Sequence, residues 1–160
     1  MSKYMRFGEM IATSTIVMFG LMYLNVYSLD HVYWSETRAY MALVMGAMMA
    51  VIMLGFMLGM YANTKVNTGI FLVSAMVFAL ALYLARSQST VEDVAWMKAM
   101  IPHHSIAILT SERANISDPR VKALADQIIS TQRKEIDEMK ALIQELEGKG
   151  PRQTTMLRIR

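Results

Sequence analysis

The sequence predicts an all-α membrane protein in two parts: three transmembrane helices, then an antiparallel helical hairpin outside the bilayer. Hydrophobic residues make up 54% of the chain and charged residues only 18%, and nearly all of the apolar excess precedes Arg86. That half holds uncharged runs of the length that crosses a bilayer, about 20 residues. The second half has the apolar period of amphipathic helices. We therefore divide the chain into a membrane domain (1–88), a hairpin (89–148) and a basic tail (149–160).

The three spans are predicted at about 10–29, 39–62 and 68–85. The first is too long for the apolar region of a signal peptide and lacks a small-residue cleavage site, so we expect it to be retained. Lys3 and Arg6 before the first span and Lys65 after the second would share the cytoplasmic side. The sequence therefore predicts a bacterial inner-membrane protein with a cytoplasmic amino terminus and a periplasmic hairpin.

The second predicted span carries methionines at every third or fourth position. They would either pass cuprous ions along the membrane or pack against neighbouring helices, and packing is favoured because the span has no buried polar groups. Two sets of small residues have the spacing that lets helices approach closely. The methionines are Met41, Met45, Met48, Met49, Met53, Met57 and Met60, and the small residues are Gly55 and Gly59, and Ala42, Gly46 and Ala50.

The hairpin is predicted as helices at about 91–115 and 119–147. Ser89 and Glu92 have the spacing of a capping box at the start of the first helix, and Pro102 should kink it. Asp118 and Pro119 provide an N-cap and a first-turn proline for the second helix. Gly148 is placed to end it.

One short stretch of the first hairpin helix concentrates possible metal ligands. Met97, Met100, His103 and His104 lie within about two helical turns, in a chain with 17 methionines, three histidines and no cysteine. Thioether and imidazole together suit copper, with Cu(I) favoured by methionine and Cu(II) as the alternative. The competing interpretation is that the methionines fill the core, His104 is a hydrogen-bonded core residue and His103 is solvated.

Two polar side chains interrupt the apolar face of the second hairpin helix. Glu135 and Gln132 lie within the arc that Met139 shares, and a buried carboxylate needs a cation or strong hydrogen bonds. A bound metal, a protonated histidine across the hairpin, or Arg113 or Lys134 would satisfy Glu135. This pattern favours a metal site over a structural histidine–glutamate pair.

The hairpin is too small to bury a sufficient core alone, since it has only about 55 residues. Two hairpins could associate into a four-helix bundle with the polar cluster inside. We therefore predict a homodimer or a higher homo-oligomer.

Three segments of the hairpin resemble domain-of-unknown-function family 305: the run from Met97 to Ile108, the turn at Asp118–Val121, and the run from Gln132 to Met139. The resemblance covers roughly residues 90–146. It implies a ferritin-like helical bundle, an extracytoplasmic location in bacteria, and a link to copper binding and resistance. The ligands it implies are Met97, Met100, His103, His104 and Met139, with Gln132 and Glu135 as further ligands or as residues that orient them.

The predicted function is a membrane-anchored periplasmic copper-binding protein that buffers copper or delivers it to a partner protein, and not an enzyme. The alternative is an accessory structural subunit whose hairpin docks on a larger membrane complex. A di-metal carboxylate enzyme is disfavoured because the hairpin lacks a Glu-x-x-His pattern, and hydrolysis because Ser105 and His104 are merely neighbours on a helix. His31, in an interfacial loop, is expected to be solvated. The basic tail would contact anionic lipid, and no nucleic-acid-binding patch is evident.

Overall fold

The computed structural model describes residues 2–148, and the predicted basic tail lies outside this part of the chain. Within it the protein is all α, as predicted, with no strands. Two short 3-10 helices, η1 (Leu29–His31) and η2 (Leu58–Met60), lie in the connections. The α-helices are α1 (Lys3–Leu21), α2 (Glu36–Phe56), α3 (Thr64–Ser87), α4 (Asp93–Arg113) and α5 (Pro119–Glu147).

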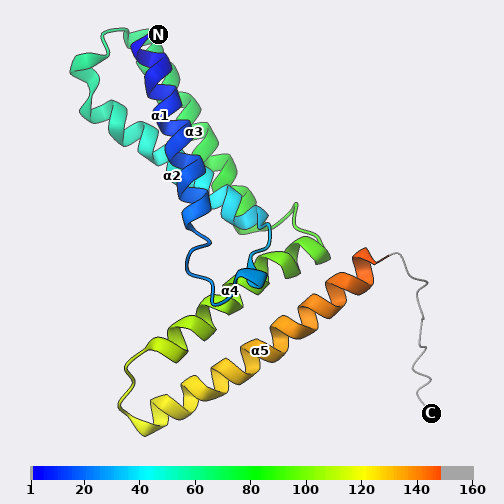
Figure 1. Ribbon diagram of the computed structural model, residues 1–160. Coiled ribbons are helices and arrows are strands. Elements are labelled where there is room, and N and C mark those ends of the chain that lie inside the picture. Colours follow the sequence, from blue (N-terminus) through cyan, green and yellow to red (C-terminus); the bar gives the residue numbers. More distant parts are fainter. Residues whose placement is uncertain (1, 149–160) are drawn as a thin grey trace.

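The first three helices form one unit and the last two another (Figure 1). Helix α2 packs against both α1 and α3, while α4 and α5 pack against each other. In the first unit a core forms around Phe7, Leu54 and Tyr61, and Met53 of α2 and Met57 of the following turn pack against it. Helices α2 and α3 are both long and apolar enough to cross a membrane.

The prediction of three transmembrane helices is not confirmed, because α1 lacks the necessary apolar length. It begins at Lys3 and carries Arg6 and Glu9 in its first turns. It ends at Leu21 rather than continuing to Leu29, and turns and the short η1 helix follow. Its uncharged helical part is therefore shorter than the roughly 20 residues that span a bilayer.

The small residues of α2 separate into two groups. Ala42, Gly46 and Ala50 are buried, and a Cβ added to Gly46 would lie 2.3 Å from the hydroxyl oxygen of Thr15. Helices α1 and α2 therefore approach closely at Gly46, as its spacing predicted. Nothing lies within 4 Å of such an atom on Gly55 or Gly59, so the expected close approach there was wrong.

The methionines of α2 and the following turn do not share one environment. Met53 and Met57 pack into the core of the first unit, whereas Met41, Met48 and Met60 are exposed on its outside. This division fits packing better than a continuous row of thioethers along one path.

The hairpin forms from two antiparallel helices joined at Asp118 and Pro119. The Asp118 side chain accepts a hydrogen bond from the backbone N–H of Arg120, so the predicted N-cap is confirmed. Helix α4 starts later than predicted, at Asp93, and the Glu92 side chain makes no capping hydrogen bond. The predicted capping box therefore does not form, although α4 continues through Pro102.

The core of the hairpin is not covered by α4 and α5 alone. Residues buried between them form one cluster, and Tyr33, from the connection between α1 and α2, packs against it. Tyr33 therefore adds to the cover that α4 and α5 give each other. The buried members are Met97, Ile101, Ile108, Ile136, Met139 and Ile143.

Candidate functional site

His104 and Glu135 face each other across the hairpin. The His104 Nδ1 atom lies 3.1 Å from Glu135 Oε2, and the exposed fractions of the two side chains are 16% and 44%. The carboxylate lies outside the direction of a hydrogen bond, so this buried nitrogen has no hydrogen-bond partner within residues 2–148. Buried polar atoms rarely lack a partner, and each such case needs an explanation.

All three predicted methionine ligands lie in or against the apolar cluster beside this pair. Met97 and Met139 are only 5% and 7% exposed, and Met100 packs against the same cluster. Met100 is one helical turn from His104 on α4, and Met139 is one turn from Glu135 on α5. Because the helices are antiparallel, both methionines lie on the same side of the His104–Glu135 contact.

The other two predicted site residues are less central. His103 is exposed, and its ring lies 6.1 Å from that of His104, centroid to centroid. Consecutive helical residues point about 100° apart, so His103 does not share the direction of His104. Gln132 is half-buried, one turn before Glu135 on α5.

The electrostatic surroundings keep His104 neutral. Burial lowers its pKa below the ordinary value of 6.5, more than Glu135 opposes, and the neighbouring His103 lowers it further. A neutral imidazole carries a free nitrogen lone pair at neutral pH, which a metal ion requires. No group of three or more histidine, cysteine or carboxylate side chains that could hold a metal lies within the described part of the chain. A metal at His104 would therefore need thioether ligands.

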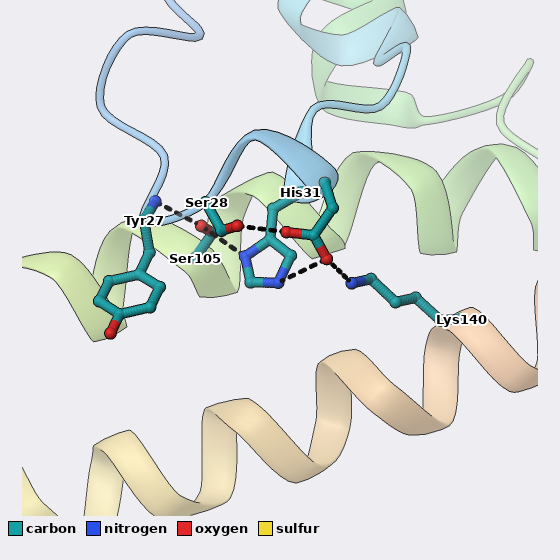
Figure 2. A network of polar contacts seen from close by, with 6 residues as sticks. Tyr27, Ser28, His31, Ser105 and Lys140 are labelled. Carbon is teal, nitrogen blue, oxygen red and sulfur yellow. Dashed lines mark hydrogen bonds and ion pairs between the residues drawn. The ribbon is translucent and has the colours of Figure 1, made fainter.

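A second polar network, which includes the α4 residue next to His104, joins the hairpin to the segment between α1 and α2 (Figure 2). Ser105 is fully buried. Its Oγ accepts a hydrogen bond of 2.7 Å from the backbone N–H of Tyr27 and lies 2.9 Å from His31 Nδ1. Asp30 continues the network, with Oδ2 3.8 Å from His31 Nε2 and an ion pair to Lys140 of α5.

The prediction that His31 is solvated was therefore wrong. Its side chain is 12% exposed, and burial lowers its pKa, although Asp30 opposes the effect. The signal that could have revealed the contact is Ser105 itself, a polar residue on the buried face between Ile101 and Ile108.

The contacts of Ser105, His31 and Asp30 resemble a catalytic triad only in composition. Ser105 is 0% exposed, so its hydroxyl is closed to a substrate. Asp30 Oδ2 is 3.8 Å from the His31 ring, too far for the hydrogen bond that orients a catalytic histidine. The network therefore acts as a structural link.

The fold and the site define an all-α protein in which a helical hairpin follows a unit with two helices that could span a membrane. Residues 83–156 match the family model described as "Domain of unknown function (DUF305)". An uncharacterized protein of Acanthamoeba polyphaga mimivirus is 32% identical over 108 residues, which cover 66% of this chain and 69% of that protein. No solved structure matches the chain. The chain belongs to the DUF305 family.

The similarity to the viral protein is not confined to the hairpin. The aligned 66% of this chain is longer than the segment 83–156, and only residues 157–160 follow that segment. The alignment must therefore include part of the first unit.

Proposed function

We propose that this chain is a membrane-anchored copper-binding protein whose hairpin holds Cu(I) as cargo. The observation that carries the proposal is the buried Nδ1 atom of His104, which has no hydrogen-bond partner among the described residues and lies beside an apolar cluster containing Met97, Met100 and Met139. A soft ion that takes one imidazole and thioethers matches this set of donors.

The residues present fit Cu(I) better than a harder ion. Ca²⁺, Mg²⁺ and most Zn²⁺ sites need several carboxylates, imidazoles or thiolates, and the described chain lacks such a group. Buried thioethers in apolar surroundings instead favour the cuprous state, with Cu(II) as the alternative. The protein would buffer copper or deliver it to a partner protein, with no chemical conversion of the ion.

His104 would be the central ligand, joined by Met100 and Met139 from the adjoining turns. Met97 would extend the set along α4, and Glu135 would complete the coordination or orient the imidazole, as Gln132 would from the turn before it. His103, which is exposed, would act at the edge of the site during loading or release.

The membrane half would anchor the hairpin in the inner membrane of a bacterium. Large apolar side chains on the outer faces of α2 and α3, including Phe56, Leu72 and Met76, are exposed and suited to lipid. Lys3, Arg6 and Lys65 would keep the amino terminus cytoplasmic and place the hairpin in the periplasm. A reporter fused after Arg160 that is active only in the cytoplasm would contradict this orientation.

The protein would also form a homodimer or a larger homo-oligomer. Helix α5 exposes Leu124, Leu142 and Leu146, and α4 exposes Trp96. A second hairpin covering these side chains would produce the ferritin-like four-helix bundle that the family resemblance implies. A single chain mass in detergent by light scattering would contradict this part of the proposal.

The decisive test is a competition titration with a chromogenic Cu(I) chelator, using the full-length protein in detergent. The wild type should take copper at a fixed stoichiometry, and His104→Ala should lose at least 100-fold in affinity. His103→Ala is the matched control and should lose less, because His103 is exposed. Helical circular dichroism must be unchanged in both variants. If wild type and His104→Ala compete equally, the copper proposal fails.

The second candidate is an accessory structural subunit. It is favoured by the exposed apolar surface around Trp96, Leu142 and Leu146, which lines a groove between the start of α4 and the end of α5. Purification of a stoichiometric complex with a larger membrane protein, free of copper by elemental analysis, would support this function.

A further inference from the structure

The segment between α1 and α2 crosses the hairpin and contacts both of its helices. We call residues 27–33 the strap. On α4 it reaches Ser105 through the Tyr27 backbone and the His31 ring. On α5 it reaches Lys140 through Asp30, and Figure 2 shows this continuous path from Ser105 to Lys140.

Ser105 is a buried polar residue whose two hydrogen-bond partners both belong to the strap. It lies on the buried face of α4 between Ile101 and Ile108, and all three residues are 0% exposed. A buried serine hydroxyl without hydrogen-bond partners at this position would destabilise the fold. Its hydroxyl oxygen accepts the Tyr27 N–H, so its own hydrogen is free to be donated to His31 Nδ1.

The strap also holds α5 at two points. The Tyr27 hydroxyl lies 3.3 Å from an Arg133 nitrogen, and the guanidinium carbon stands 5.6 Å from the Tyr27 ring centroid. Arg133 and Lys140 are seven residues apart, about 10 Å along a helix. The two contact points lie on either side of Glu135 and Met139.

The strap thus touches both helices at the level of the candidate copper site without supplying a ligand. Ser105 directly follows His104, and Lys140 directly follows Met139. The strap's last residue, Tyr33, packs on the cluster that holds the three methionines. A segment in contact with both helices restricts their separation, and ligand positions within about 0.5 Å decide how well a site binds.

We propose that the strap is a positioning element of the copper site, and that His31 and Lys140 are its positioning residues. The membrane half then helps to set the metal affinity of the hairpin. This inference rests on the proposed function, because it concerns the geometry of the same site.

The test compares pairs of variants in the full-length protein by Cu(I) competition. His31→Leu removes the acceptor that faces Ser105, whereas His31→Asn keeps a polar atom near the position of Nδ1. Lys140→Met removes the ion pair to Asp30, and Lys140→Arg retains a cation. Lys122→Met is the control, because Lys122 pairs with Asp126 on the same helix, away from the strap.

His31→Leu should weaken Cu(I) binding about tenfold, the lower end of the effect of residues that orient metal ligands. Lys140→Met should weaken it only about threefold, because it removes a partly exposed ion pair. His31→Asn, Lys140→Arg and Lys122→Met should stay within about twofold of wild type. X-ray absorption of the copper-loaded variants should show a changed sulfur-to-nitrogen coordination ratio in the weakened variants only. If His31→Leu binds like wild type, or if His31→Asn is as weak as His31→Leu, the positioning role is refuted; the second result would make His31 a ligand.

A metal-free measurement separates this inference from the copper proposal. The chain has no cysteine, so Asp93→Cys/Glu145→Cys can carry two spin labels at the open end of the hairpin. His31→Leu should broaden the distance distribution between the labels, while His31→Asn should not. If wild type fails to bind copper but the distribution broadens, the proposed function fails and the strap still positions α4 and α5. If the distribution is unchanged, the strap does not position them.

Discussion

Two histidines contact the hairpin, His31 from the strap and His104 from α4, and their side chains are similarly buried but differ in their hydrogen-bond partners. His31 meets the Ser105 hydroxyl at Nδ1 and faces Asp30 at Nε2. His104, which precedes Ser105 on α4, faces the Glu135 carboxylate, which lies outside hydrogen-bond direction. The first arrangement satisfies its polar groups and stabilises the structure. The second leaves a donor atom for a ligand, and this contrast separates a structural histidine from a candidate metal ligand more clearly than burial does.

The largest expected effect on stability comes from removing the hydroxyl group that bonds Tyr27 and His31. Ser105→Ala should lower the free energy of unfolding by about 1–3 kcal/mol, because it leaves the Tyr27 N–H and the buried His31 ring without their partner. Thermal unfolding followed by circular dichroism in detergent would measure the loss. Thr110→Ala is the control, since Thr110 bonds only carbonyls of its own helix. Equal losses in both variants would show that the strap adds nothing to stability.

Acidification should lower the free energy of unfolding by a smaller amount, through both His31 and His104. Burial lowers the pKa of His31 and of His104 below 6.5, so the unfolded chain binds more protons than the folded one as the pH falls past that value. The free energy of unfolding therefore rises with pH through this window and decreases below it. Melting temperatures of the metal-free protein between pH 7.5 and pH 5 should fall, and His31→Asn and His104→Met should each flatten the curve. A slope that neither variant changes would contradict the assignment.

Replacing the unsatisfied histidine should cost little in the absence of metal. His104→Met removes a buried nitrogen that has no hydrogen-bond partner within the described residues, and Glu135 is exposed enough to be hydrated. The free energy of unfolding should change by less than about 1 kcal/mol, measured by the same thermal unfolding. A loss of more than about 2 kcal/mol would instead indicate that His104 and Glu135 form a structural pair.

The smallest expected effect concerns the ion pair between Asp30 of the strap and Lys140 of α5. Lys140→Met should reduce stability by about 0.5 kcal/mol, and added salt should reduce the difference, as for other surface ion pairs. In the wild type, the hydrogen bond from Lys140 lowers the pKa of the Asp30 carboxyl group to about 2. This carboxylate is therefore charged at all but strongly acidic pH. Nuclear magnetic resonance titration should show that pKa rising toward 3.8 in the variant. An unchanged value would mean that the pair does not form in solution.

Local sequence signals predicted much of the fold. The turn at Asp118 and Pro119 depends on an N-cap and a fixed proline φ, both of which are local properties. The contact of His104 with the Glu135 helix followed from apolar periodicity in two antiparallel helices. Gly46 was identified in the same way, by spacing along α2.

The errors arose where contacts join distant parts of the chain. Nothing near His31 in the sequence indicates Ser105, 74 positions away. The predicted first span extends beyond α1, which ends at Leu21, because an uncharged run does not show where its helix ends. The copper ligands Met97, Met100, His103, His104 and Met139, together with copper binding itself, remain predictions.

The strap also constrains the order in which the chain can fold during synthesis. Tyr27 precedes Ser105 by 78 positions, and Asp30 precedes Lys140 by 110. At typical translation rates the helices it binds emerge roughly 4–20 s later. The strap is therefore made before both of its partner helices, and its contacts with them can form only after the hairpin has been synthesised. In a chain whose synthesis is paused before α5, the strap would lack its contacts with that helix, and proteases should cleave it near Asp30.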